Sequence, residues 1–205
     1  MPERFKYPEQ PIIFIAISHL FNCLSYIIHF LFGTSASCTS NTHPVLIKNG
    51  PNGNSHCSVV FIIWEYFLFS ATFWWLILAY SWLLASKFKY SVEAVEAKST
   101  LFHAIGWGVP GLLLGITLVS NSVHADPLTG MCKLKYGSLL YIVPETIIII
   151  LSLGMMSISL TSMCRIQKSL QKYNLYTEKS ERLENLTYKI LKFSFIYMFP
   201  KGTLF

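Results

Sequence analysis

Two acidic residues, Glu65 and Glu145, stand inside long apolar runs of this 205-residue chain. Acidic side chains within apolar segments of membrane-spanning length usually face a cavity or a polar partner. One helical stripe of an earlier run carries polar residues at intervals of four, three and four, namely Ser18, Asn22, Ser25 and His29. The hypothesis is a polar pocket that includes His29, Glu65 and Glu145. The alternative is that each acid is protonated or reaches water near the outer face.

The other residues that could do chemistry do not converge on a catalytic or metal site. The six histidines are scattered over different runs and connecting segments: His19, His29, His43, His56, His103 and His124. The chain has neither the His-x-x-Glu-His spacing of a zinc enzyme nor a glycine-rich phosphate loop. No Ser, His and Asp arrangement suggests an activated nucleophile. We therefore expect neither an enzyme nor a bound cofactor or metal.

Four apolar runs must position these residues, at about 12–32, 59–85, 101–119 and 139–163, and a fifth begins near 190 and is truncated. Each complete run is near or above the roughly 20 residues that cross a bilayer as a helix. The expected fold is therefore all-α, a polytopic membrane helical bundle. A water-soluble core is the competing explanation, but its helices rarely stay apolar on all faces for so long. A signal peptide is the other alternative for the first run, which is longer than such segments.

Basic residues fall mainly on alternate connecting segments. Twelve of the 16 Lys and Arg residues lie before the first run, between the second and third, and from the end of the fourth through Lys192; the opposite side carries Lys48, Lys133, Lys135 and Lys201. The positive-inside rule then predicts a cytoplasmic N-terminus. The net charge of +6 marks orientation, with anionic inner-leaflet lipid as its expected partner, and does not indicate nucleic-acid binding.

Cysteines and small residues add further expectations. Cys38, Cys57 and Cys132 fall on the predicted outer side, where disulfides persist, whereas Cys23 and Cys164 are expected to be free thiols. Gly111 and Gly115, spaced four apart, would allow the close approach of another helix. Four aromatic residues of the second run are expected in the bundle core or an interfacial belt: Phe69, Phe73, Trp74 and Trp75.

A family resemblance appears between Cys57 and Cys132. The residues that carry it are Cys57, Trp74, Trp75, Trp82, Lys89, residues 93–97, Phe102, His103, Trp107, Pro110, Asp126 and residues 128–132. This stretch resembles the Frizzled receptors, class F of the seven-helix receptors. Residues 4–14 resemble the family's first inner loop running into its second helix, and residues 189–200 resemble the start of its sixth.

On this mapping, residues 1–205 are a partial Frizzled-type transmembrane domain with helices two to five and part of six. The extracellular cysteine-rich domain is absent, and so are the first and seventh helices. We therefore expect an incomplete receptor fragment or a degenerate relative. Glu65 stands where the family is expected to carry Tyr, and the segment between Cys132 and Pro144 is shorter than expected, which puts the family's usual loop hairpin in question.

The resemblance implies roles for particular residues. Cys57 and Cys132 would form a disulfide bond, and Lys189 would be the basic switch residue at the base of helix six. The effector-facing loops would present Lys87, Phe88, Lys89, Arg165 and Lys168 to Dishevelled or a heterotrimeric G protein. The competing interpretations are that Lys189 only reaches toward lipid headgroups and that the loop at Lys87 is a solvated helix along the membrane.

The function implied is that of a Wnt-type receptor in the plasma membrane, whose ligand would bind through the missing domain. An outside ligand would bias two arrangements of the bundle. The main alternative is a non-signalling four-span scaffold of the tetraspanin or claudin kind, or a degenerate receptor relic. A transporter is a third interpretation, which would gain if Glu65 and Glu145 bound a cation.

Overall fold

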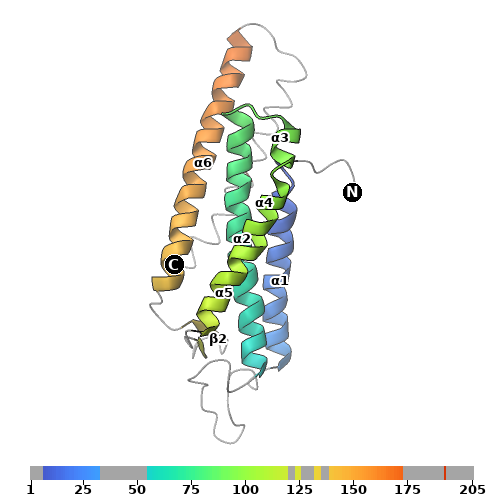
Figure 1. Ribbon diagram of the computed structural model, residues 1–205, viewed down its shortest axis with the longest axis vertical. Helices are drawn as coiled ribbons and strands as arrows, with labels where there is room; N and C mark the ends of the chain where they lie inside the picture. The colour runs from blue at the N-terminus through green and yellow to red at the C-terminus, as the bar shows by residue number, and fades with distance from the viewer. Residues whose placement is uncertain are drawn as a thin grey trace, which may run out of the picture.

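The structure is a computed structural model that describes residues 7–32, 55–119, 123–125, 132–134, 139–172 and 192. At 32, 55–58, 123–125, 132–134, 139–142, 167 and 170–172 it describes the backbone alone. The elements, in chain order, are α1 (Pro11–Phe32), α2 (Ser55–Ser86), α3 (Val92–Glu96), α4 (Ser99–His103), the π-helical turn η2 (Ala104–Gly108), α5 (Val109–Val119), β1 (Val123–Ala125), β2 (Cys132–Leu134) and α6 (Leu139–Lys172). The expected all-α bundle is confirmed (Figure 1).

Among the described residues, four helical stretches are long and apolar enough to cross a membrane: Pro11–Leu31, Val59–Ser86, Ser99–Val119 and Val143–Ile166. The sequence placed the four runs within a few residues of these bounds. The short hairpin that the sequence put in question is present, because β1 and β2 pair antiparallel with Ala125 opposite Cys132. We call the end of the bundle that carries this hairpin the strand end (Figure 1).

Helix α2 is the centre of the bundle. It packs against α1, α5, η2, α6 and β2, and it is buried on most faces, whereas α1, α5 and α6 each leave apolar side chains exposed. In Figure 1, α1 and α6 flank α2 on opposite sides. The aromatic residues Phe69, Phe73, Trp74 and Trp75 are 7% exposed or less. They therefore lie in the bundle core.

The third span contains a π-helical turn just before Pro110. Proline has no N–H to donate to the carbonyl four residues earlier, that of Gly106. Helix α2 supplies donors instead: Ser70 Oγ donates to Gly106 O at 3.0 Å, and Tyr66 Oη donates to Trp107 O at 3.2 Å. Two side chains of α2 thus satisfy backbone oxygens at the irregular turn, which ties α2 to the third span.

The close helix approach occurs at a different glycine from the two expected. A Cβ atom on Gly111 would meet only Tyr66 at 3.8 Å, and one on Gly115 would meet nothing within 4 Å. A Cβ atom on Gly106 would lie 2.6 Å from a ring carbon of Trp74. The helix packing expected at Gly111 and Gly115 is therefore wrong for the described residues, whereas the alternative, a dimer contact, stays a prediction. A spacing of four residues indicates which side chains share a helix face, but it does not show where a neighbouring helix comes close. The indole ring of Trp74 on α2 leaves no room for a side chain at Gly106, in the π-helical turn.

Candidate functional site

Glu65 and Glu145 are both buried although each carries a carboxyl group. Glu65 on α2 is 0% exposed and Glu145 on α6 is 3% exposed. The buried face of α6 is packed on α2 and consists of Glu145, Ile148, Ser152, Met156, Ser159 and Met163. The structure thus buries two of the three residues expected in the polar pocket, on two helices that contact each other.

His29 lies at a different level. Asn22 Nδ2 donates to the carbonyl oxygen of Trp64 at 2.9 Å, so Asn22 is level with Glu65. His29 is seven residues further along α1, which is about 10 Å at the helical rise. Its Nδ1 atom is buried and has no hydrogen-bond partner among the described residues. The polar stripe of α1 does face α2, but it places His29 nearer the strand end than Glu65.

The opposite end of the bundle gathers basic residues, and we call it the basic end. Lys87, Phe88 and Lys89 form the exposed turn after α2, where Phe88 is 55% exposed. Lys87 Nζ lies 5.8 Å from the centre of the Phe88 ring. Lys89 has a φ of 55°, and the Tyr90 N–H donates to Leu84 O at 3.1 Å. A left-handed residue therefore ends α2 and turns the chain back.

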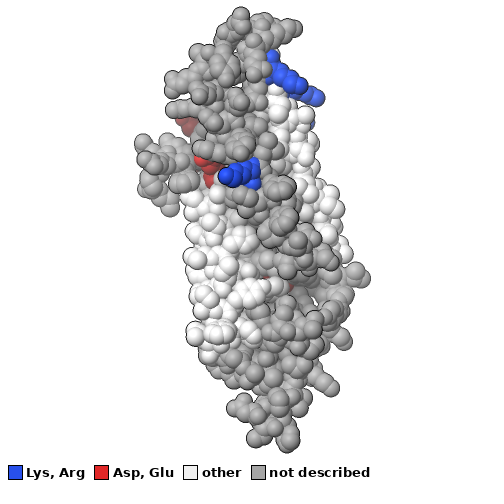
Figure 2. Space-filling model, turned by 180° about the vertical axis from the view of Figure 1, so that it is seen from behind, with Lys and Arg blue, Asp and Glu red and all other residues white. Residues whose placement is uncertain are grey.

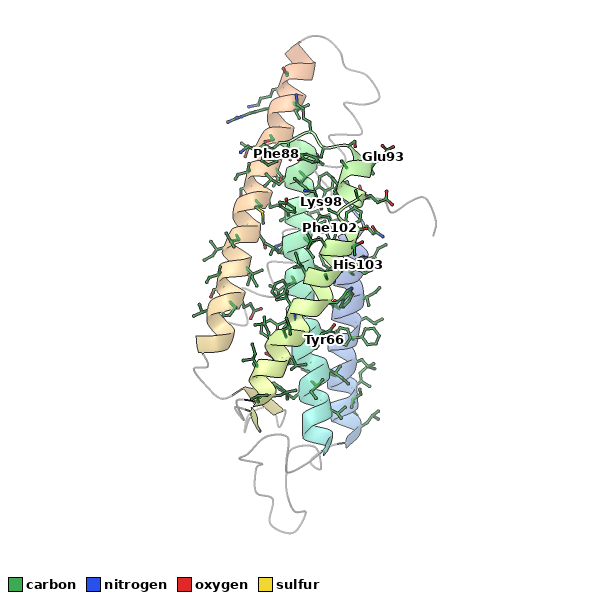
Figure 3. All side chains as sticks on the ribbon, in the orientation of Figure 1. Tyr66, Phe88, Glu93, Lys98, Phe102 and His103 are labelled. Carbon is green, nitrogen blue, oxygen red and sulfur yellow. The ribbon has the colours of Figure 1, made fainter. Side chains whose placement is uncertain are left out.

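The same end carries the last turns of α6 and the start of the third span. Arg165 and Lys168 are exposed on α6, which extends past the end of α2 (Figure 1). Figure 3 places Phe88, Glu93 and Lys98 together at this end, while Tyr66 lies nearer the strand end. In Figure 2 the charged side chains of the described residues gather mainly in the upper part of the molecule. The structure thus brings Lys87, Phe88, Lys89, Arg165 and Lys168 to one end.

A buried tyrosine anchors the chain that enters α1 at the basic end. Tyr7 is 2% exposed, and its ring centre lies 5.5 Å from that of Phe102 on α4. Ser81 Oγ donates to the carbonyl oxygen of Pro8 at 3.3 Å. Burial, and secondarily the charge of Glu96, raises the pKa of the Tyr7 phenol from 10.0 to about 12. Tyr7 therefore stays neutral at physiological pH and acts as a packing group between α2 and α4.

Several expected site residues lie outside what the structure describes. For Cys57 and Cys132 only the backbone is described; Cys57 is in α2 and Cys132 is in β2, two elements that contact each other. Cys38 and Lys189 lie outside the described residues. Cys23 and Cys164 are free thiols, as expected. The Cys57–Cys132 disulfide and the Lys189 switch remain predictions.

Comparison with known proteins decides the family. The model of the Frizzled/Smoothened family membrane region matches residues 1–205. The chain belongs to this family. It is 31% identical to mouse Frizzled-6 over 98% of the chain and 29% of that protein, and 32% identical to rat Frizzled-4 over 96% of the chain and 37% of that protein. Frizzled-4 of Xenopus laevis is 33% identical over 96% of the chain and 38% of its own length.

Family membership and the four apolar helices make this chain a multi-pass membrane protein and its bundle a partial class F fold. The chain spans less than two-fifths of the length of these relatives. Sequence reasoning missed the hydrogen bonds of Tyr66 and Ser70 to the third span and the buried position of Tyr7. Pro110 was the available signal for the first, because a proline in a helix leaves a carbonyl that needs another donor.

Proposed function

We propose that this chain is the central membrane portion of a Wnt-type receptor that relays an extracellular signal to Dishevelled or a heterotrimeric G protein. The observation that carries the proposal is the family match over residues 1–205. The relatives named Frizzled-6 and Frizzled-4 align over nearly the whole chain. The ligand would be recognised by parts of a complete receptor that lie beyond these helices.

In this proposal the strand end faces the outside of the cell and the basic end faces the cytoplasm. The charge bias of the whole sequence supports this orientation, since twelve of the 16 Lys and Arg residues fall on the predicted inner side. The described residues Lys87 and Lys89 lie in the turn after α2, and Arg165 and Lys168 lie on the last turns of α6, which Figure 1 shows at that same end. A tag inserted after Gly50 should be labelled by a membrane-impermeant reagent on intact cells. Protection of the tag until the cells are permeabilised would reverse the orientation.

The exposed side chains at the basic end would bind an effector that has an acidic surface. The turn after α2 exposes the Phe88 ring, with the Lys87 ammonium group 5.8 Å from its centre and Lys89 as the next residue in the chain. The end of α6 adds Arg165 and Lys168. Exposed aromatic and arginine side chains are the groups most often enriched at binding sites, and rim charges steer association. Movement of the α6 end relative to the α2 turn would change the surface that the effector meets.

A chimeric receptor tests this function. Residues 1–205 would replace the matching stretch of rat Frizzled-4, and recruitment of fluorescent Dishevelled to the plasma membrane would be measured. We expect recruitment by the chimera and a loss of at least severalfold with Lys87→Glu combined with Lys89→Glu. Lys48→Glu, a charge reversal on the predicted outer side, is the control. A chimera that reaches the surface but recruits neither Dishevelled nor a G protein would contradict the proposal.

The same chimera tests the roles predicted for Lys189 and for the Cys57–Cys132 pair, whose side chains the structure does not describe. Lys189→Ala should raise basal signalling, because the resemblance makes this residue part of an inactivating contact. Unchanged basal output would remove that role. Mass analysis after thiol alkylation should find Cys57 and Cys132 joined, and two separately alkylated thiols would exclude the disulfide.

A further inference from the structure

An exposed serine follows the basic turn after α2. Ser91 is exposed and lies two residues after Lys89 and four residues after Lys87. Its backbone is extended, with a φ of −66° and a ψ of 157°, and it directly precedes α3. Its Oγ atom accepts a hydrogen bond from the N–H group of Ala94 at 3.3 Å. The side chain therefore caps α3 from an exposed position.

The nearest serines along the chain and the serine at the end of α6 are placed differently. Ser86 is 7% exposed, and its hydroxyl group donates to Trp82 O at 2.7 Å. Ser99 is half-buried in α4, and Ser169 is exposed but lies within α6. A protein kinase binds its substrate as an extended segment, so a serine inside a helix requires local unwinding. Of these four serines, only Ser91 combines an exposed side chain with an extended backbone.

The charges around Ser91 suit an enzyme with an acidic substrate groove. All of residues 87–92 are exposed, and two of the four residues that precede Ser91 are lysines. The Nζ atom of Lys98 lies 5.5 Å from the ring centre of Tyr90, the residue just before Ser91. Figure 3 shows Lys98 and Glu93 at this same end of the bundle. Kinases select substrates by such patterns of charge before and after the acceptor.

We propose that Ser91 is phosphorylated by a cytoplasmic kinase that recognises basic residues, and that the phosphate closes the proposed effector surface. This inference rests on the proposed function, because it needs the basic end to face the cytoplasm. The phosphoryl donor is ATP. A bond forms between Ser91 Oγ and the γ-phosphorus of ATP, the bond from that phosphorus to ADP breaks, and the hydroxyl proton passes to a carboxylate base of the kinase.

The phosphate changes the charge of the turn and leaves its local structure in place. It carries a charge of about −1.5 to −2, which offsets the two ammonium groups of Lys87 and Lys89. A phosphate oxygen can still accept the Ala94 N–H group, and negative charge is favourable at the first turn of a helix. An effector with an acidic surface then meets a turn that no longer attracts it.

Mass spectrometry tests the site itself. The Frizzled-4 chimera would be isolated from cultured cells treated with a phosphatase inhibitor and digested with trypsin. Cleavage after Lys89 and Lys98 releases residues 90–98 as one peptide, in which fragment ions distinguish Ser91 from Tyr90. We expect a phosphate on Ser91 that phosphatase treatment removes. A receptor that reaches the surface without phosphate on Ser91 would overturn the proposal.

Two variants test the consequence. Ser91→Asn keeps a capping side chain but has no hydroxyl group, whereas Ser91→Asp keeps the cap and adds a negative charge. At equal surface expression, we expect Ser91→Asp to recruit severalfold less Dishevelled than Ser91→Asn. Equal recruitment by the two variants would overturn the proposal and leave the receptor function in place. A chimera that carries phosphate on Ser91 but recruits no effector would instead contradict the proposed function and support the phosphorylation site.

Discussion

Helices α2 and α6 look alike in sequence but are held in the bundle in different ways. They have 32 and 34 residues, both are strongly apolar, and each carries one buried glutamate. Hydroxyl groups of α2 reach other elements: Ser70 and Tyr66 donate to carbonyl oxygens of the third span, and Ser81 donates to Pro8 O.

The buried hydroxyl groups of Ser152 and Ser159 on α6 donate to carbonyl oxygens of the same helix. Ser152 Oγ donates to Ile148 O at 2.6 Å and Ser159 Oγ donates to Met155 O at 3.0 Å. Side-chain hydrogen bonds thus tie α2 to the third span and to the segment before α1, whereas the hydroxyl groups of Ser152 and Ser159 bond within α6. Two apolar helices of similar length can therefore be held in one bundle by different kinds of contact.

The largest expected effect is at the contact between α2 and the π-helical turn. Gly106→Ala would place its Cβ atom 2.6 Å from the Trp74 ring, and Trp74 is held in turn by Phe14 at 4.3 Å between ring centres. Such overpacking should lower the free energy of unfolding by about 3 kcal/mol. Thermal unfolding in detergent micelles, followed by tryptophan fluorescence, measures it.

Gly154→Ala on α6 is the matched control, because an added Cβ there meets nothing within 4 Å. Alanine is a better helix former than glycine, so this variant should be neutral or more stable by up to about 1 kcal/mol. Equal destabilisation by the two variants would remove the distinction between the helices.

Alkaline pH should loosen the anchoring of the N-terminal segment to α2 and α4. Because the pKa of Tyr7 rises from 10.0 to about 12 on folding, the folded state holds its proton more tightly than the unfolded state. The stabilisation by Tyr7 is complete below pH 10 and is lost as the pH rises toward 12. The unfolding midpoint of the wild type should therefore fall more steeply over this window than that of Tyr7→Phe. Parallel pH profiles would contradict the burial of the phenol.

Hydroxyl removal compares the two helices directly. Ser70→Ala deprives the Gly106 carbonyl oxygen of its donor and should lower stability by about 1 kcal/mol. Ser152→Ala removes a hydroxyl that bonds only to its own helix, at Ile148 O, and should change stability by a few tenths of a kcal/mol. The unfolding midpoints of both variants would be compared in the same micelles. A larger loss in Ser152→Ala would reverse this comparison.

The smallest expected effect is at the end of α2. Lys89 has a φ of 55°, a conformation that costs an L-residue roughly 1 kcal/mol and glycine almost nothing. Lys89→Gly should therefore be neutral or raise the unfolding midpoint by a degree or two, while it removes one ammonium group from the proposed effector surface. A chimera that is stable but recruits Dishevelled less well would separate the structural and binding roles of this residue. Clear destabilisation would show that the lysine itself holds the turn.

The sequence predicted the four spans well because a helix that crosses hydrocarbon must be about 20 residues long and apolar, and both properties can be counted. It also predicted the polar stripe of α1, since the helical period places Ser18, Asn22 and Ser25 on one face. The sequence did not predict where a helix comes close to the third span. A spacing of four shows that Gly111 and Gly115 share a face, but it does not show which residue lies opposite. The close contact is instead between Trp74 and Gly106.

The sequence alone determined that this chain is a helical membrane protein of the Frizzled type, because hydrophobicity, charge bias and family residues are properties of the chain itself. Only the tertiary structure decided that α2 is central and that Glu65 and Glu145 are both buried. It also decided that His29 stands at another level and that Tyr66 and Ser70 support the irregular turn at Pro110. These facts depend on the relative height and rotation of neighbouring helices, which the packing of side chains from distant parts of the chain sets.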